Sequence, residues 1–170
     1  MFSYTKFNNK VCALIGINKT KKRISTLLKY KVIKHMILKM SNFHTYKTKV
    51  YYEDTDAGGI VYYAKYLHFM ERARTEMIYD RFKLNHKDLK NDFNAIFVVR
   101  ECNIKYHKSA NFEDHLEVCT YVSKKSSVRL NLIQEVKRKK ETLVTAEVEL
   151  AVIDSNGSIS KLSKNLLEKI

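Results

Sequence analysis

Two aspartates and two glycines stand close together in one short segment of the chain. Asp54 and Asp56 flank Thr55, and Gly58 and Gly59 follow directly. Glycine allows the backbone to come close to a bound ligand. A carboxylate such as that of Asp56 can attack a carbonyl carbon or take a proton from a water molecule. These residue types, in this order, are suited to acyl transfer.

A helix is predicted to begin just after these residues, near Ile60. The first N–H groups of a helix have no partner within it and lie at the positive end of its dipole, so they can stabilise a developing oxyanion. The alternative role of the carboxylates is structural, because aspartate is a favoured N-cap and either Asp54 or Asp56 could cap this helix. The residues alone leave both roles open.

The flanking segments must position this loop. A β-branched and aromatic run predicts a strand over residues 46–52, and the residues from 53 to 59 predict a loop. Apolar residues at helical spacing predict a helix over residues 60–79, with a wide apolar face made by Tyr66, Met70, Ala73 and Met77 together with Leu67, Phe69 and Ile78. A second, small helix is expected within residues 84–92, and a short one within residues 163–170.

Four later stretches alternate apolar and polar residues with a period of two, which predicts half-buried antiparallel strands. The predicted inner faces are Ile96, Val98, Arg100, Cys102, Ile104 and Tyr106; Leu116, Val118, Thr120 and Val122; Val128, Leu130, Leu132, Gln134 and Val136; and Val144, Ala146, Val148, Leu150 and Val152. The order strand, long helix, four strands predicts an α+β domain in which a five-stranded antiparallel sheet wraps around one long helix.

The composition is that of a globular protein, with 170 residues, 45% of them hydrophobic and 29% charged. No apolar run reaches the roughly 20 residues that span a bilayer, which excludes a membrane-spanning helix. The formal net charge is +14, and residues 1–40 carry ten of the basic residues and no acidic one. The sequence therefore divides into a basic extension over residues 1–40 and one domain over residues 41–170.

The basic extension has several interpretations. It could bind nucleic acid without sequence preference, target the protein to a compartment, or serve as a secretory signal. The interpretation that we favour is a translated leader ahead of a true start at Met40, because the regular pattern begins just after that residue. Nucleic acid is accordingly not expected as the main partner.

The metal-binding residue types show no ligand spacing. Cys12, Cys102 and Cys119 are odd in number and include no CxxC pair, and the histidines are scattered. We therefore expect no metal and no cofactor. An odd number of cysteines also favours a reducing, cytoplasmic setting.

The loop and its flanks resemble a known family. The segment Tyr51–Tyr62, the helical segment Glu71–Glu76 and the strand segment Phe97–Arg100 are similar to the signature of the hotdog-fold acyl-CoA thioesterases of the 4-hydroxybenzoyl-CoA thioesterase class. The resemblance is closest to the YbgC-like group, which is associated with the Tol-Pal system. It covers residues 44–165 and none of the basic extension.

The resemblance implies roles for individual residues. Asp56 matches the catalytic carboxylate, as a nucleophile or a general base. Tyr63, seven residues later, matches the position whose backbone N–H polarises the thioester carbonyl. The YbgC-like group often has histidine there, and the backbone donor survives the change. Glu71 and Glu76 are reserve carboxylates on the helix, for which we favour ion pairs with Arg72 or Arg74.

The resemblance also implies a substrate and partners. The substrate would be a short-chain or aromatic acyl-CoA, held by the Gly58–Gly59 backbone, with its phosphates near Arg100, Lys124, Lys125 and Ser126. Hotdog domains pair edge to edge, so a homodimer or homotetramer is expected. The alternative function is a non-catalytic hotdog module that binds acyl carrier protein or an envelope-associated partner.

Overall fold

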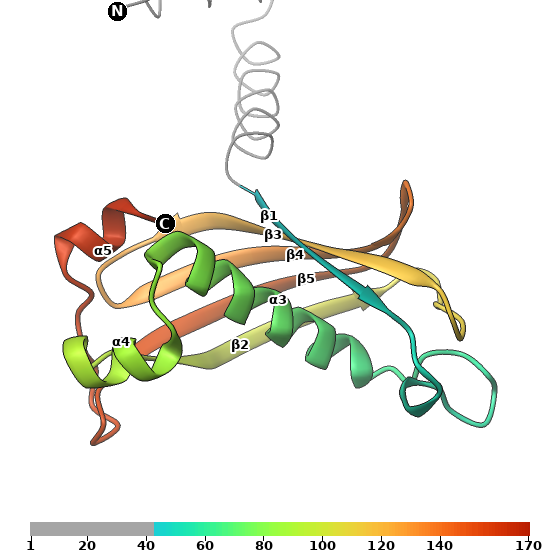
Figure 1. Cartoon of the computed structure of the whole chain (residues 1–170), viewed down its shortest axis with the longest axis horizontal. Coiled ribbons are helices and arrows are strands. Elements are labelled where there is room, and N and C mark those ends of the chain that lie inside the picture. The colour runs from blue at the N-terminus through green and yellow to red at the C-terminus, as the bar shows by residue number, and fades with distance from the viewer. Residues whose placement is uncertain (1–42) are drawn as a thin grey trace, which may run out of the picture. The chain divides into compact units, whose positions relative to one another are not determined.

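The computed structural model describes residues 43–170, and the predicted extension over residues 1–40 lies outside the described residues. The chain folds into one antiparallel sheet of strand order β1-β3-β4-β5-β2, with helix α3 lying across one face (Figure 1). The elements are β1 (Phe43–Lys49), the 3-10 turn η1 (Tyr52–Asp54), α3 (Lys65–Phe82), α4 (His86–Phe93), β2 (Ile96–Tyr106), β3 (His115–Lys125), β4 (Arg129–Arg138), β5 (Glu141–Ile153) and α5 (Lys164–Glu168). This arrangement confirms the predicted α+β fold.

The hydrophobic core lies between α3 and the inner face of the sheet. The predicted apolar positions of the helix are buried, except that Leu67 is exposed. The predicted inner faces of the last three strands are also correct, because their side chains at every second position are buried or half-buried. A sheet that has one face covered by a helix and the other face in solvent requires this alternation. The pattern therefore predicted these three strands correctly.

The helix begins later than predicted. We expected it from residue 60, but α3 starts at Lys65 because the preceding residues pair with other parts of the chain. Val61 forms a β-bridge with Thr55 and donates its N–H to the Ala110 carbonyl at 2.9 Å. These long-range bonds hold residues 60–62 in an extended form. The first strand is likewise shifted, and covers residues 43–49 rather than 46–52.

The predicted inner face of β2 is wrong for its first half. The register between β2 and β5 shifts between Val99 and Glu101, so that Arg100 is an extra residue in the strand. A β-bulge reverses the alternation of side chains along a strand. Phe97 therefore points inward and stacks on Phe82 of α3, with ring centroids 6.2 Å apart. The even-numbered positions of β2 face inward only after the bulge.

A buried polar network ties α3 to the centre of the sheet. The Gln134 side chain on β4 donates to the Thr120 hydroxyl at 2.9 Å and to the Met70 carbonyl at 3.0 Å. It accepts from the Arg74 guanidinium at 2.8 Å. Desolvation lowers the pKa of Arg74. Because each of these side chains has a hydrogen-bond partner in the network, the network fixes the helix against the strands.

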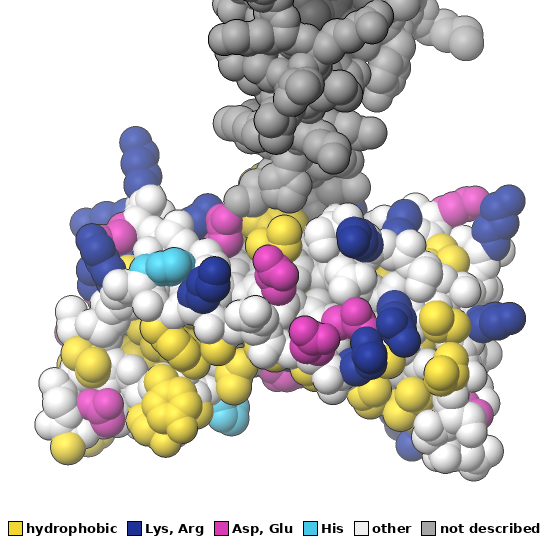
Figure 2. Space-filling view, turned by 180° about the vertical axis from the view of Figure 1, so that it is seen from behind, with side chains coloured by type: hydrophobic (Ala, Val, Ile, Leu, Met, Phe, Trp, Pro, Cys, Tyr) yellow, Lys and Arg dark blue, Asp and Glu magenta, His cyan; other side chains and the backbone are white. Residues whose placement is uncertain are grey.

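The opposite face of the sheet carries a mixture of acidic and basic side chains, with hydrophobic ones gathered toward the β2 edge (Figure 2). Within residues 43–170, no helix is long and apolar enough to cross a membrane.

Candidate active site

The loop between β1 and α3 carries the predicted chemistry and lies at one end of the sheet (right in Figure 1). A tight turn forms its tip, in which the Gly59 N–H donates to the Asp56 carbonyl at 3.0 Å. The Asp56 N–H donates to the Ile60 carbonyl at 2.9 Å, so the chain returns alongside itself. Asp56 therefore lies at the start of this turn, and the residues on either side of the turn pair with each other. The second of these two segments continues to α3.

Asp54 is the structural member of the aspartate pair. It is only 4% exposed, and its carboxylate accepts from the Tyr51 N–H at 2.9 Å. It also forms an ion pair with Lys65 at 3.3 Å, and its carbonyl accepts from the Tyr62 N–H at 2.9 Å. Both oxygens of this carboxylate are engaged, so Asp54 fastens the loop to the start of α3.

Asp56 is the available member. Its side chain is exposed, and Oδ1 accepts from the Gly58 N–H at 2.8 Å. Oδ2 has no hydrogen-bond partner within residues 43–170. The single bond fixes the direction of the carboxylate, while the second oxygen stays open to solvent. This arrangement suits a nucleophile or a general base.

Both glycines of the loop have a local reason. A Cβ at Gly58 would lie 3.1 Å from Asp56 Oδ1, so the close approach of this carboxylate favours a residue without a side chain. Gly59 has a φ of +74°, in the left-handed region that side chains disfavour. The Gly-Gly pair thus shapes the turn that holds Asp56.

Tyr63 lies two residues before α3. Neither its N–H nor that of Ala64 meets an acceptor in the described part of the chain, and Ala64 is the N-cap of α3. The Tyr63 side chain is 59% exposed, and its ring packs against the Tyr62 ring with centroids 4.6 Å apart. The Tyr63 hydroxyl raises the pKa of Tyr62, with smaller contributions from burial and from Asp56. Asp56 and Tyr63, at the open start of the helix, are therefore both exposed to solvent and lie seven residues apart in the chain.

The predicted structural roles of these carboxylates, helix capping by an aspartate and ion pairs of Glu71 and Glu76, are wrong. Neither aspartate caps α3, because Ala64 is the N-cap and no side chain bonds to it. Glu71 accepts from the Thr75 hydroxyl at 2.8 Å. Among residues 43–170, no ion pair joins Glu71 or Glu76 to Arg72 or Arg74.

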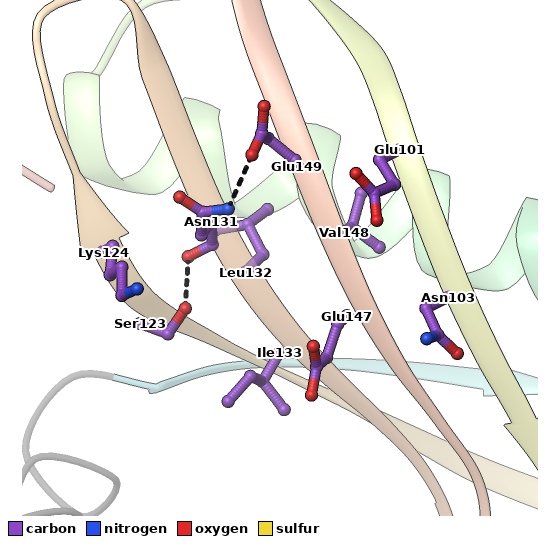
Figure 3. A pocket seen from close by; sticks show the side chains of 10 residues that line it. All are labelled: Glu101, Asn103, Ser123, Lys124, Asn131, Leu132, Ile133, Glu147, Val148 and Glu149. Carbon is purple, nitrogen blue, oxygen red and sulfur yellow. Dashed lines mark hydrogen bonds between the residues drawn. The ribbon is translucent and has the colours of Figure 1, made fainter.

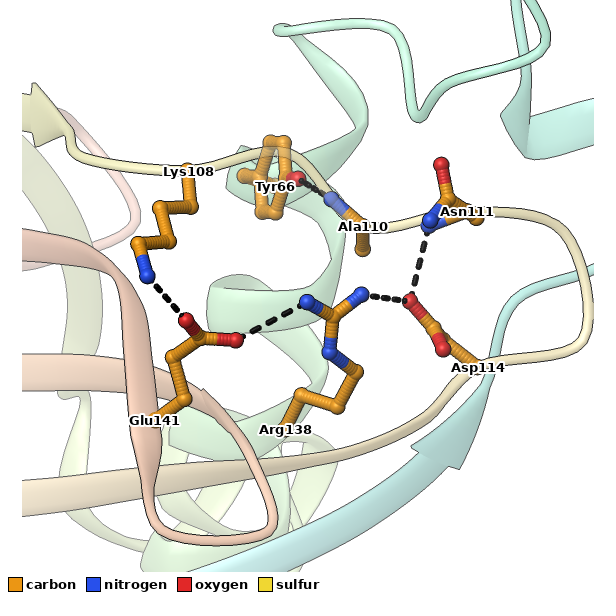
Figure 4. Close-up of polar contacts among 7 residues, drawn as sticks. All are labelled: Tyr66, Lys108, Ala110, Asn111, Asp114, Arg138 and Glu141. Carbon is orange, nitrogen blue, oxygen red and sulfur yellow. Dashed lines mark hydrogen bonds and ion pairs between the residues drawn. The ribbon is translucent and has the colours of Figure 1, made fainter.

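A second loop, residues 107–114, contacts the first, and its polar contacts are drawn in Figure 4. The Ala110 N–H donates to the Tyr66 hydroxyl at 2.8 Å, and Asn111 forms a β-bridge with Ile60. The Asp114 carboxylate accepts from the Asn111 N–H at 2.8 Å and from Arg138 at 2.7 Å. The 107–114 loop therefore contacts the backbone of the aspartate loop on one side. On the other side it is bonded to Arg138, the last residue of β4.

Ion pairs extend this support. Arg138 also bonds Glu141 at 2.8 Å, and Glu141 pairs with Lys108. Burial raises the pKa of Asp114, but the bonds from Asn111 and Arg138 outweigh it and lower that pKa overall. The bonds from Lys108 and Arg138 lower the pKa of Glu141.

The structure does not bring the predicted phosphate-binding residues to this loop. Strand β3 begins at His115, next to the 107–114 loop, and ends at Lys125, so at about 3.3 Å per residue it is about 33 Å long. Lys124, Lys125 and Ser126 lie at its far end. Arg100 lies six residues before Tyr106 on β2 and bonds Glu149 at 2.5 Å. Within one chain, only Asp56, Gly58, Gly59 and Tyr63 of the predicted set come together.

These distant residues have partners of their own. Lys125 donates to the Leu167 and Ile170 carbonyls, each at 2.8 Å. Ser126 accepts from the Arg129 N–H at 3.0 Å in the turn between β3 and β4. Lys124 lines a hollow of about 260 Å³ on the outer face of the sheet, together with Glu101, Asn103, Ser123, Asn131, Leu132, Ile133, Glu147, Val148 and Glu149 (Figure 3).

Among the described residues, no group of three or more His, Cys, Asp or Glu side chains could hold a metal ion.

The sequence analysis did not identify two residues that contact the site. Tyr106 and Arg138 approach it from β2 and β4, far along the chain from the loop, and no local pattern marks such a contact.

Comparison with known proteins places the chain in a family. The family model described as the thioesterase-like superfamily matches residues 50–170. Acyl-CoA thioesterase YbgC of Haemophilus influenzae is 38% identical over 115 residues, which cover 68% of this chain and 84% of that protein. Acyl-CoA thioester hydrolase YbgC of Escherichia coli O6:H1 is 38% identical over 107 residues, covering 62% and 78%.

A solved structure agrees. The crystal structure named "Probable Thioesterase" from Bartonella henselae is 33% identical, with a TM-score of 0.67 over 71% of this chain and 99% of that chain. The chain therefore belongs to the thioesterase-like superfamily. Within it, the chain is a YbgC-like member with the hotdog fold, which confirms the resemblance seen in the motif.

Proposed function

We propose that this chain hydrolyses an acyl-CoA thioester to the free acid and CoA, with Asp56 as the catalytic carboxylate. The observation that carries the proposal is the exposed Asp56 carboxylate in the short loop that ends at Tyr63, whose N–H meets no acceptor within residues 43–170, in a chain of a thioesterase family. The names of the YbgC relatives supply the class of substrate.

The reaction needs an acceptor for charge and a group that attacks. The thioester carbonyl oxygen accepts a hydrogen bond from the Tyr63 N–H, which strengthens as that oxygen becomes negative. In one route, Asp56 Oδ2 attacks the carbonyl carbon, the C–S bond breaks, and the CoA thiolate takes a proton from water. Water then hydrolyses the mixed anhydride. In the other route, Asp56 takes a proton from a water molecule as that water attacks, and the tetrahedral intermediate expels the thiolate.

The surroundings favour a short or aromatic acyl group. Tyr62, Tyr63 and Tyr106 expose aromatic rings beside the loop, being 44%, 59% and 44% exposed. Rings of this kind bind flat apolar groups by stacking. Gly58 and Gly59 leave room for the substrate at the turn itself.

The proposal assigns CoA phosphates to the predicted phosphate-binding residues of a second copy. Arg100, Lys124, Lys125 and Ser126 lie too far from Asp56 of the same chain, so a role in substrate binding requires them to come from a partner. Within residues 43–170, β1 and β2 each pair with one strand only, and a homodimer or homotetramer could form at these two edges. Light scattering of the full chain tests this, and a monomer would contradict it.

Two further features belong to the proposal. The exposed free thiol of Cys102 suits a reducing cytoplasm. The resemblance to the Tol-Pal-associated group suggests work near the cell envelope. The second candidate function is a non-catalytic module, for which the acid-free basic residues 1–40 would favour an acidic partner such as acyl carrier protein.

The experiment is thiol release by the full chain from a panel of acetyl, butyryl, palmitoyl, benzoyl and 4-hydroxybenzoyl CoA esters. The proposal expects turnover of the short-chain or aromatic esters and much slower turnover of palmitoyl-CoA. If no ester turns over while purified acyl carrier protein binds, the non-catalytic module is the correct function.

A further inference from the structure

Tyr106 touches the backbone at the centre of the proposed site, although it lies outside the family motif. Its hydroxyl donates a hydrogen bond to the Tyr63 carbonyl at 3.2 Å. Its ring packs edge-on against Tyr63, with centroids 6.3 Å apart and an interplanar angle of 89°. Within residues 43–170, it is the only side chain that donates to this carbonyl.

The backbone around Tyr63 is held on both sides. The Tyr62 carbonyl accepts from the Lys65 N–H at 2.9 Å, which fixes the peptide unit that contains the Tyr63 N–H. The bond from Tyr106 fixes the next peptide unit. Because each unit is planar and trans, the bond from Lys65 sets the direction of the Tyr63 N–H, and the bond from Tyr106 sets the direction of the Ala64 N–H in the next unit. Only one of the two bonds comes from a side chain.

Tyr106 is itself rigidly placed. It is the last residue of β2 and pairs with Val144, which is fully buried on β5. The ring also packs against Tyr66 at 5.9 Å, and the Tyr66 hydroxyl accepts from the Ala110 N–H. Burial, with smaller contributions from Cys102 and Tyr63, raises the pKa of Tyr106. The hydroxyl therefore keeps its proton, and remains a donor, throughout the neutral range.

We propose that Tyr106 is a positioning residue for thioester hydrolysis, which holds the Tyr63–Ala64 peptide so that the Ala64 N–H, next to the Tyr63 N–H, is a second donor to the carbonyl oxygen of the substrate. The inference rests on the proposed function of this site. Without the bond, the Tyr63–Ala64 peptide can rotate, and the Ala64 N–H loses its fixed direction. The loss affects the transition state more than substrate binding, because the hydrogen bond to the oxygen strengthens as negative charge develops.

The test compares Tyr106→Phe with wild type, using the ester that wild type hydrolyses fastest. Phenylalanine keeps the ring packing and removes only the hydroxyl. We expect kcat to fall about 10-fold with KM nearly unchanged, less than the roughly 10²–10³-fold lost when an oxyanion donor itself is removed. Amide hydrogen exchange at residue 64 should become faster. Tyr79→Phe is the matched control, because its exposed ring lies on α3 and its hydroxyl has no partner in the described chain.

Every outcome decides the proposal. An unchanged kcat overturns it, as does a rise in KM alone, which would make Tyr106 a binding residue. A fall in kcat together with a lower thermal midpoint would assign Tyr106 to fold stability instead. Asp56→Asn, measured in parallel, separates this proposal from the proposed function: if that variant keeps full turnover, the function fails whatever Tyr106→Phe does.

Discussion

Asp54 and Asp56 are two residues apart and have opposite environments. Asp54 is buried and bonded through both carboxylate oxygens, whereas Asp56 is exposed and bonded through one. The residue types alone could not separate them, because the difference depends on Tyr51 and Lys65, which approach only when the loop closes. The resemblance of the motif singled out Asp56, since this position matches the catalytic carboxylate of the family.

The role of Asp54 leads to a prediction about stability. Asp54→Ala should lower the free energy of unfolding by about 1–3 kcal/mol, because the Tyr51 N–H and Lys65 lose their buried partner. Urea denaturation of the two proteins measures the difference. Asp92→Ala, at an exposed position on α4 with no ion pair in the described chain, is the control and should change stability little. Equal stability of Asp54→Ala and wild type would contradict this role.

At the scale of the elements, local patterns predicted what local chemistry decides. The buried faces of α3, β3, β4 and β5 were correct because each element is amphipathic along its own length. The start of α3 and the inner face of β2 were not. The first depends on the pairing of Ile60 with Asn111, and the second on an extra residue at Arg100. Neither leaves a local signal.

The turn that carries Asp56 should respond to a change in its backbone. Gly59→Ala places a side chain at a φ of +74°, with no atom within 4 Å of the new Cβ. The expected loss of stability is therefore the backbone cost alone, about 1–2 kcal/mol. We also expect kcat to fall severalfold, because relaxation of the turn moves the Asp56 carboxylate.

Gly157→Ala is a matched control for that change. Gly157 has a φ of +81° and lies in the turn after β5, and a Cβ at this position would also have no atom within 4 Å. Thermal unfolding should show a similar loss for both variants, and thiol release should be slower only for Gly59→Ala. If both variants keep the wild-type kcat, the turn does not position the carboxylate.

At the scale of the whole molecule, charges join segments that are distant in sequence. Arg138 connects the 107–114 loop to the turn between β4 and β5 through Asp114 and Glu141. The pKa of each carboxyl is lowered from its ordinary 3.8 or 4.5. A lowered pKa means that these groups stabilise the fold fully above those values and lose that contribution as the pH falls through the folded pKa.

This network predicts a dependence of stability on pH. Wild type should lose stability between about pH 5 and pH 3 more steeply than Arg138→Met, because the variant loses the contribution of Arg138 to the lowering of the two pKa values. Urea midpoints at several pH values measure the slope. Arg72→Met is the control, since Arg72 is exposed and has no ion pair within residues 43–170. Parallel curves for wild type and Arg138→Met would exclude the network as the cause.

The most direct test of the central claim is the turnover of Asp56→Asn. Asparagine keeps an oxygen for the Gly58 N–H, so the turn should persist and the thermal midpoint should stay at the wild-type value. Thiol release from the preferred acyl-CoA should fall about 10²–10⁴-fold, as expected when a positioned acid–base group is lost. Wild-type turnover by the folded variant would contradict the assignment of Asp56 as the catalytic carboxylate.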